Sequence, residues 1–180
     1  MTWEIQILDW LQTFHSPAGD ALMKGITFLG DGGIIWILLT VILLAVPRTR
    51  KAGAVLGTAL LLDLILCNGL LKNLVARMRP YEVNEKVQLL IRAPGDYSFP
   101  SGHTAASFAS VSALYFAGAR RLWKPALGLA VLIAFSRLYL YVHFPTDILG
   151  GIAVGILCGY LGYRLIEMAV EKRKKFSQSS

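Results

Sequence analysis

Five long apolar runs divide the chain, and short polar or basic stretches separate them. The runs cover about residues 34–46, 52–74, 103–118, 125–142 and 148–169. An α-helix needs ~20 apolar residues to cross a bilayer, and several of these runs approach or reach that length. The pattern predicts an all-α protein, a polytopic transmembrane helical bundle with five spans.

The first 30 residues follow a different pattern. Over residues 2–14 the large apolar side chains share one helical face: Trp3, Ile7, Trp10, Leu11 and Phe14. This spacing predicts an amphipathic helix at the membrane interface, where tryptophan is favoured. A second segment, 18–29, is short for a span, and Gly30–Gly33 then interrupts the chain. A sixth span in this region stays an alternative.

Composition supports a membrane protein. Hydrophobic residues make up 55% of the 180 residues and charged residues only 16%, against roughly 25% charged residues in soluble domains. The net charge of +7 does not indicate a nucleic-acid partner, because the basic residues cluster between apolar runs. Cys67 and Cys158 lie inside apolar runs without metal-ligand spacing, so we expect both in the core.

The distribution of charge predicts the orientation. With five spans, one side of the membrane collects a strong excess of basic residues: Arg48, Arg50, Lys51, Arg120, Arg121, Lys124, Arg164, Lys172, Arg173, Lys174 and Lys175. The positive-inside rule makes this side cytoplasmic. We therefore divide the chain into an interfacial segment (1–30), a bundle (31–171) and a basic cytoplasmic tail (172–180). No cleavable signal peptide is expected, because the N-terminus lacks a basic region followed by an unbroken apolar one.

Three polar blocks fall on the opposite, outer side. The first contains Lys72 and Arg79, followed by Pro80. The two cations are about two helical turns apart, so both can point the same way, and Pro80 should make the chain leave the helix at Arg79. Taken alone, two cations at a membrane edge are more often simply hydrated there.

The second block opens the run at residue 103. Ser101 suits an N-cap, and Gly102 lets a ligand approach the backbone, where the free N–H groups of a helix start bind anions. His103 would lie in the first turn, beside such an anion. An ordinary capped helix with an interfacial histidine is an equally good interpretation of this block alone.

The third block contains Arg137, His143 and Asp147. An aspartate four residues after a histidine can accept its ring N–H and leave the other nitrogen free to attack. Taken singly, Asp147 as the N-cap of the last helix is a credible alternative. Together the blocks put cations, a helix start and two histidines on one face, which suits the spread charge of a phosphate in its transition state. No carboxylate cluster suggests a metal site, so metal-independent chemistry without a cofactor is expected.

The three blocks resemble the signature motifs of the type 2 phosphatidic acid phosphatase superfamily, which shares its site with vanadium haloperoxidases. The resemblance covers residues 72–147, at Lys72-x₆-Arg79-Pro80, Pro100-Ser101-Gly102-His103 and Ser136-Arg137-x₅-His143-x₃-Asp147. It implies that His143 attacks phosphorus, that Asp147 orients His143, and that His103 protonates the leaving group and then helps to activate water. It also implies a set of phosphate-binding residues: Lys72, Arg79, Ser101, Gly102 and Arg137.

Several other polar residues carry weaker signals. Asp63 and Asn68 lie within a predicted span, where polar groups are costly. Asn68 suits an interhelical hydrogen bond or a supporting contact to Lys72, and Asp63 has no assigned role. Arg77 and Arg92 are expected to be solvated loop charges, with recruitment of an anionic headgroup as the alternative. Leu89–Ile91 would dip into the interface or pack locally.

These patterns favour a phosphatase that acts on a membrane lipid phosphate or diphosphate at the outer face of a bacterial plasma membrane. Undecaprenyl diphosphate is the favoured substrate; phosphatidylglycerol phosphate and phosphatidic acid are the alternatives. Haloperoxidase chemistry and a transporter or lipid-binding protein are further alternatives. The expected partners are the lipid substrate and the bilayer, and nothing in the pattern indicates an oligomeric state.

Overall fold

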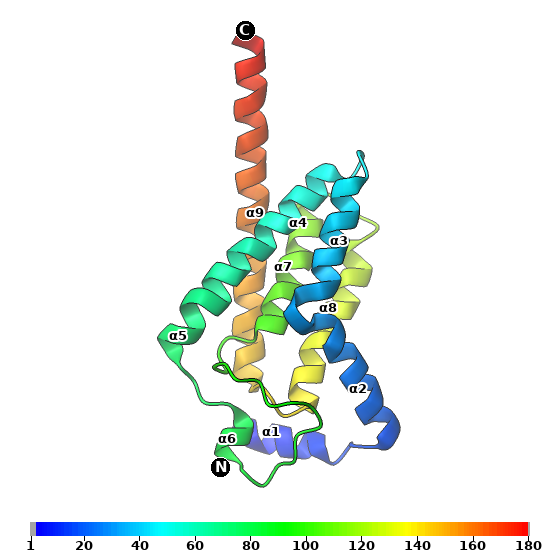
Figure 1. Ribbon diagram of the computed structural model, residues 1–180, viewed down its shortest axis with the longest axis vertical. Coiled ribbons are helices and arrows are strands. Elements are labelled where there is room, and N and C mark those ends of the chain that lie inside the picture. Colours follow the sequence, from blue (N-terminus) through cyan, green and yellow to red (C-terminus); the bar gives the residue numbers. More distant parts are fainter. Residues whose placement is uncertain (1–2, 180) are drawn as a thin grey trace.

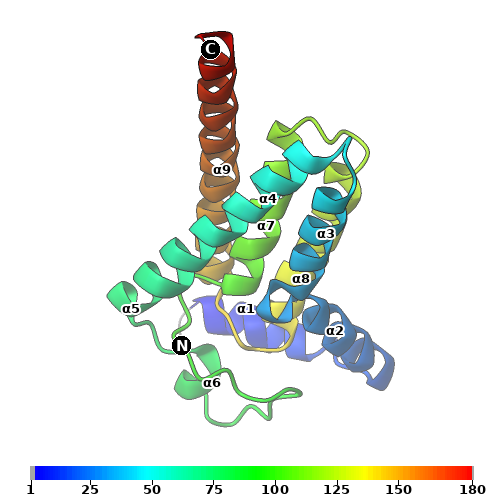
Figure 2. The same cartoon turned by 45° about the horizontal axis from the view of Figure 1, so that its top comes forward.

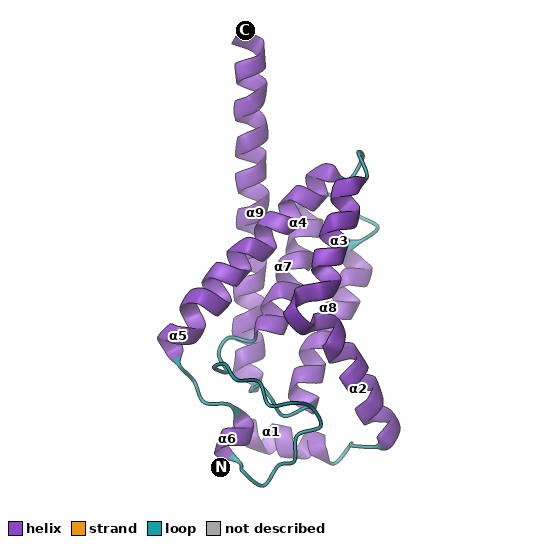
Figure 3. Cartoon of the chain, in the orientation of Figure 1, coloured by secondary structure: helices purple, strands orange, loops and turns teal. Residues whose placement is uncertain are grey.

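The computed structural model describes residues 3–179, and every regular element within that range is helical (Figures 1 and 3). The elements are α1 (Trp3–Gln12), α2 (Pro17–Gly30), the 3₁₀ turn η1 (Asp31–Gly33), α3 (Ile34–Ala45), α4 (Arg50–Asp63), the π-helix η2 (Leu64–Leu71), α5 (Lys72–Val75), α6 (Pro80–Val83), α7 (Gly102–Phe116), α8 (Trp123–Tyr139) and α9 (Pro145–Ser179). The all-α prediction is confirmed, and each of the five apolar runs forms a helix.

The number of membrane spans is not confirmed. Three helical segments are long and apolar enough to cross a bilayer: Pro17–Ala45, Arg50–Val83 and Pro145–Lys175. The first joins the short segment predicted at 18–29 to the first apolar run, because η1 continues the helix through a kink. Helices α7 and α8 have 15 and 17 residues, fewer than the ~20 of a typical span.

The core lies between α3, α4, α7, α8 and α9, and Cys158 is buried within it. Helix α7 packs most extensively against α9. A stripe of glycines on α9 allows this contact: a Cβ at Gly155 would lie 2.5 Å from the carbonyl oxygen of Ala105, and one at Gly159 would lie 2.4 Å from Ser112 Cβ. Close backbone contact of this kind is typical of helices in membranes. It places the start of α7 beside the start of α9.

Helix α1 lies across the end of the bundle opposite to the C-terminus (Figures 1 and 2). Its buried face consists of Glu4, Ile5, Leu8 and Leu11. Most of the predicted apolar face is turned away from the protein, since Trp3, Ile7, Trp10 and Phe14 are exposed. Such a face suits the membrane interface, but the helix also docks on the bundle through a second face that the sequence pattern did not indicate.

The chain leaves the second apolar run earlier than predicted. It departs from the helix at Ala76, which has a left-handed φ of 47°, and not at Arg79. Just before this point, residues 64–71 form a π-helix, a distortion that often occurs at functional sites. The loop that follows packs back on the bundle, with Leu89–Ile91 against a buried cluster of Tyr139, Leu140 and Val142.

The basic C-terminal segment is helical where it is described. Helix α9 runs through residues 172–179 as an extension beyond the other helices (Figure 1). Residue 180 of the predicted tail and residue 2 of the predicted N-terminal helix lie outside the described residues.

Candidate functional site

The three polar blocks meet around one cavity of about 560 Å³. Its lining includes most of the predicted site residues: Lys72, Arg79, Gly102, His103, Arg137 and His143. They come from the start of α5, the residue before α6, the start of α7, the end of α8 and the turn before α9. The structure thus brings together residues up to 71 positions apart in sequence, while the roles assigned to them stay predictions.

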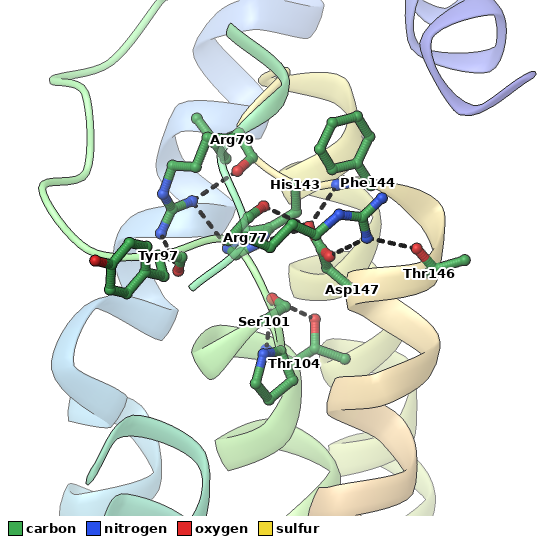
Figure 4. A network of polar contacts seen from close by, with 12 residues as sticks. Arg77, Arg79, Tyr97, Ser101, Thr104, His143, Phe144, Thr146 and Asp147 are labelled. Atoms are coloured by element: carbon green, nitrogen blue, oxygen red, sulfur yellow. Dashed lines mark hydrogen bonds and ion pairs between the residues drawn. The ribbon is translucent and has the colours of Figure 1, made fainter. Parts of the chain in front are cut away.

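His143 lies fully buried in the turn between α8 and α9. Its Nδ1 is 3.4 Å from Oδ2 of Asp147, and its Nε2 is 3.2 Å from Nη1 of Arg79. One ring nitrogen therefore faces the carboxylate of Asp147 and the other faces the guanidinium of Arg79 (Figure 4). Burial lowers the pKa of His143 to about 3, although Asp147 opposes the shift. At neutral pH the imidazole is neutral and retains a lone pair.

This lowered pKa links stability to pH. An unfolded chain forms the imidazolium below about pH 6.5, whereas the folded protein disfavours it. The contribution of His143 to the free energy of unfolding is therefore fully present above that pH and is lost as the pH drops towards 3. Between pH 7 and pH 5 we expect His143 to cost about 2 kcal/mol of unfolding free energy. Thermal unfolding in detergent at both pH values, compared with His143→Gln, measures this contribution. An equal pH shift in both proteins would contradict it.

Asp147 is held by four groups around its carboxylate. Oδ1 accepts a hydrogen bond from Arg77 Nη1 at 2.6 Å, and Oδ2 accepts from the backbone N–H of Phe144 at 2.8 Å and from the hydroxyl of Ser98. His143 Nδ1 faces the same Oδ2. Such a carboxylate is fixed in position and ionised, and it can orient the imidazole.

Arg77 corrects the sequence-based expectation of a solvated loop charge. Its Nη1 binds Asp147 and also donates to Thr146 Oγ1 at 2.6 Å (Figure 4). Its Nη2 pairs with Glu4 Oε2 at 2.6 Å. The guanidinium lies 4.1 Å from the centre of the Phe144 ring. The early end of the helix at Ala76 explains the difference, because it turns Arg77 towards the 143–147 turn. No motif around Arg77 signalled this contact.

Glu4 completes the support from the N-terminal side. Its Oε1 accepts hydrogen bonds from the backbone N–H of Thr146 at 3.1 Å and from the Thr146 hydroxyl at 2.7 Å. Glu4 does not belong to the apolar face predicted for this helix, yet its side chain is buried. Helix α1 therefore anchors the turn that carries His143 and Asp147.

Asp96 is a second residue that the motifs missed. Its carboxylate pairs with Lys72 Nζ through one oxygen and with Arg79 Nη2, at 2.6 Å, through the other. Partial burial raises the pKa of Asp96, but hydrogen bonds and charges from Lys72 and Arg79 outweigh this effect and lower it to about 2. Asp96 is half exposed, whereas Lys72 and Arg79 are buried. A carboxylate thus bridges two predicted phosphate-binding cations.

The start of α7 has the predicted cap. Ser101 is buried, and its hydroxyl accepts from Thr104 Oγ1 at 2.9 Å and from the Thr104 N–H at 3.4 Å (Figure 4). A Cβ at Gly102 would lie 3.0 Å from Oδ1 of Asn68 and 3.7 Å from Nζ of Lys72. Glycine at this position therefore allows Asn68 and Lys72 to approach the helix start. No hydrogen bond joins Asn68 to Lys72 among the described contacts.

Arg137 and His103 complete the cavity wall. Arg137 is buried, and its Nη1 donates to the hydroxyl of Thr27. His103 Nε2 is 2.8 Å from Oδ1 of Asp31, in η1. Both helix α2 and the turn after it thus contribute to the site, although the sequence patterns placed them outside it.

A second cavity of about 540 Å³ extends the site along the bundle. It shares Lys72, Asp96, Gly102 and His103 with the first and continues between α3 and α4 along Ile37, Val41, Leu60, Leu61 and Leu64. Asp63 lies in its wall and is buried, and its Oδ1 has no hydrogen-bond partner among the described residues. We call this apolar extension the α3–α4 groove.

Comparison with known proteins places this geometry in context. A family model described as the PAP2 superfamily matches residues 52–171. An undecaprenyl-diphosphatase of Sulfolobus acidocaldarius is 31% identical over 131 residues, which are 73% of this chain and 63% of that protein. The chain therefore spans slightly less than two thirds of that relative.

Two bacterial proteins are similar to this chain over most of their own length. The undecaprenyl-diphosphatase BcrC of Bacillus subtilis is 30% identical over 154 residues, covering 86% of this chain and 78% of BcrC. The crystal structure of Aquifex aeolicus LpxE superposes with a TM-score of 0.79 at 26% identity, covering 91% of this chain and 96% of LpxE.

Proposed function

The chain belongs to the PAP2 superfamily, and we propose that it is a membrane phosphatase that hydrolyses a lipid phosphate or diphosphate through a phosphohistidine. One observation carries the proposal: the buried His143 and the cations Lys72, Arg79 and Arg137 line a cavity that continues into the α3–α4 groove. The cavity suits a phosphate and the groove suits the chain attached to it.

The phosphate is held by charge and by the backbone. Lys72, Arg79 and Arg137 supply positive charge that neutralises its oxygens. The free N–H groups at the start of α7, after Ser101, add donors and a favourable helix dipole. These donors stabilise the charge that spreads over the oxygens in the transition state.

His143 is the nucleophile in this mechanism. The lone pair on Nε2 forms a bond to phosphorus while the bond from phosphorus to the leaving oxygen breaks and its electrons pass to that oxygen. Asp147 accepts the Nδ1–H and stabilises the positive charge that develops on the ring, as a carboxylate does for a catalytic histidine. Arg77 and Ser98 keep Asp147 in place.

His103 transfers the protons. It donates a proton to the leaving oxygen in the first step and takes one from the attacking water in the second. Water then forms the new bond to phosphorus, the bond to Nε2 breaks, and its electrons return to His143. Inorganic phosphate and the dephosphorylated lipid leave, and the enzyme regains its starting protonation.

The favoured substrate is undecaprenyl diphosphate. Two relatives carry the name undecaprenyl-diphosphatase, and the apolar lining of the α3–α4 groove suits a long isoprenoid chain. Phosphatidylglycerol phosphate and phosphatidic acid are the alternative substrates, since both also join a phosphate to apolar chains.

Phosphate release from a lipid panel tests the proposal. Purified protein in detergent with EDTA is offered undecaprenyl diphosphate, phosphatidylglycerol phosphate and phosphatidic acid at equal concentration. Highest kcat/KM on the first is expected; highest kcat/KM on another lipid would reassign the substrate. Release from none would contradict the phosphatase, and lipid binding without release would favour a lipid-binding protein or transporter. Loss of activity in EDTA would contradict the metal-independent mechanism.

We propose further that the site faces the outside of a bacterial plasma membrane, with the C-terminus in the cytoplasm. The basic residues at the opposite end of the bundle support this orientation. A cysteine placed at the exposed Lys86 should react with an impermeant thiol reagent in intact cells, while the buried Cys67 and Cys158 stay unlabelled. Labelling only after lysis would reverse the orientation.

Asp96 offers a test of the phosphate-binding cations. Removal of its charge in Asp96→Asn leaves Lys72 and Arg79 without their carboxylate partner, so inorganic phosphate should bind more tightly. We expect about a fivefold lower inhibition constant for phosphate, equivalent to about 1 kcal/mol, and a larger rise in Tm on phosphate addition. Glu85→Gln, an exposed carboxylate in the same loop, serves as control. An unchanged or raised constant would contradict the assignment of these cations.

A further inference from the structure

Gly30 and Asp31 lie against the ring of His103. Asp31 Oδ1 lies 2.8 Å from His103 Nε2. A Cβ at Gly30 would lie 2.7 Å from Cδ2 of the same ring and 3.0 Å from Ile133 Cγ2, so the backbone passes directly against the imidazole. Gly32 and Gly33 have left-handed φ values of 57° and 70°, which let the chain turn there into α3. The stretch that interrupts the helix pattern in the sequence therefore contacts the side chain of His103.

We propose that Asp31 is the positioning residue for His103 in the reaction. This inference rests on the proposed function. Asp31 accepts the Nε2–H and fixes the tautomer and the ring plane, so that Nδ1 is the nitrogen available to the leaving oxygen. Asp31 lines the same cavity as His103, His143 and the phosphate-binding cations, which places it beside the leaving group without a direct role in the bond changes.

The charges around His103 explain why such a partner is needed. Lys72, Arg79 and Arg137 line the same cavity, and their positive charges disfavour an imidazolium. His103 must nevertheless carry a proton before it donates one to the leaving oxygen. The carboxylate of Asp31 offsets the repulsion while the Nδ1 proton passes to the oxygen, and again when water returns a proton to Nδ1. Its own hydrogen bond to Nε2 persists throughout.

The leaving group distinguishes this role from a purely structural one. Farnesyl phosphate and farnesyl diphosphate carry the same isoprenoid chain but differ in leaving group. The leaving group of the first is an alkoxide, which requires a proton. That of the second is farnesyl phosphate, which requires a proton far less. Asp31→Asn should lower kcat on the monophosphate about tenfold, within the contribution of a general acid, and kcat on the diphosphate less than about threefold. Asp31→Glu should recover part of the loss.

Two controls complete the experiment. Asp20→Asn removes a carboxylate of α2 that accepts a hydrogen bond from Tyr139, away from His103, and should keep the wild-type ratio of the two substrates. The double variant Asp31→Asn/His103→Ala should be no slower than His103→Ala alone, because Asp31 acts through that ring. If one farnesyl compound is a poor substrate, the single and double variants of Asp31 and His103 are compared on the panel lipid that gives the highest activity.

The outcomes separate the two proposals. Three results would overturn the role of Asp31: equal loss of kcat on both farnesyl compounds, additive losses in the double variant Asp31→Asn/His103→Ala, or wild-type rates in Asp31→Asn. In each case, phosphate release by the wild-type protein would still uphold the phosphatase. Absence of phosphate release by the wild type from every lipid would overturn the phosphatase and, with it, the role of Asp31.

Discussion

Replacement of His143 by alanine is expected to reduce phosphate release at least about 1,000-fold, because the variant lacks the nucleophile. The three histidines of the chain provide a matched control. His15 stacks on Tyr139, with ring centres 4.3 Å apart, and lies outside the site. His15→Ala should therefore retain wild-type kcat, even if it lowers thermal stability.

The same variant tests the covalent step. When substrate labelled in the phosphate is quenched in alkali during turnover, wild-type protein should carry label as a base-stable phosphoramidate, and His143→Ala should carry none. Substantial turnover by His143→Ala, or label retained on the variant, would remove His143 from the role of nucleophile. The Tm of each variant must be compared with the Tm of the wild-type protein at pH 7, where the stability effect of the histidine charge is absent.

Replacement of Arg77 by alanine is expected to have the second largest effect. Asp147 is fully buried, and loss of its 2.6 Å partner leaves an uncompensated charge, which typically costs about 3–5 kcal/mol. We expect a loss of about this size in unfolding free energy and a fall of about 10- to 100-fold in kcat, since loss of the residues that orient a functional group has effects of this order. Unfolding in detergent and the lipid assay measure the two quantities.

Two further variants keep this prediction testable if Arg77→Ala does not fold. Glu4→Gln leaves the pair of Arg77 with Asp147 intact and weakens only the link to α1, so a smaller fall in kcat is expected. Lys86→Ala removes an exposed cation from the loop after α6 and should change neither quantity. Wild-type kcat and stability in Arg77→Ala would show that Asp147 does not depend on Arg77.

The sequence was sufficient for the family, and most of the residues that it singled out line one cavity, while their roles stay predictions. Spacing alone predicted helices over each apolar run, the cap at Ser101 and the pair of His143 with Asp147, all of which are local features. The family resemblance is confirmed, and so is the phosphatase class that it implies. The prediction of five spans is not confirmed, because hydrophobicity identifies helices more readily than it identifies which of them cross a bilayer.

The residues that support the site were not predictable, for a physical reason. Glu4, Asp31, Arg77 and Asp96 reach the site through contacts between distant segments, and no motif or spacing in the sequence marks them. Which of them turns inwards depends on where the helix ends at Ala76, on the path of the loop before α7 and on the kink at η1. These features result from packing and carry no periodic signal.

The clamp between Glu4 and the 146–147 turn has a consequence for biosynthesis. Glu4 precedes its partner Thr146 by 142 positions, and chains are made and inserted from the N-terminal end. Until α9 begins to emerge, Glu4 of the nascent chain is therefore without its partner Thr146. His143 and Asp147 reach their full set of supporting contacts only at that late moment, so under the proposed mechanism we expect a chain that stops before residue 146 to have no phosphatase activity.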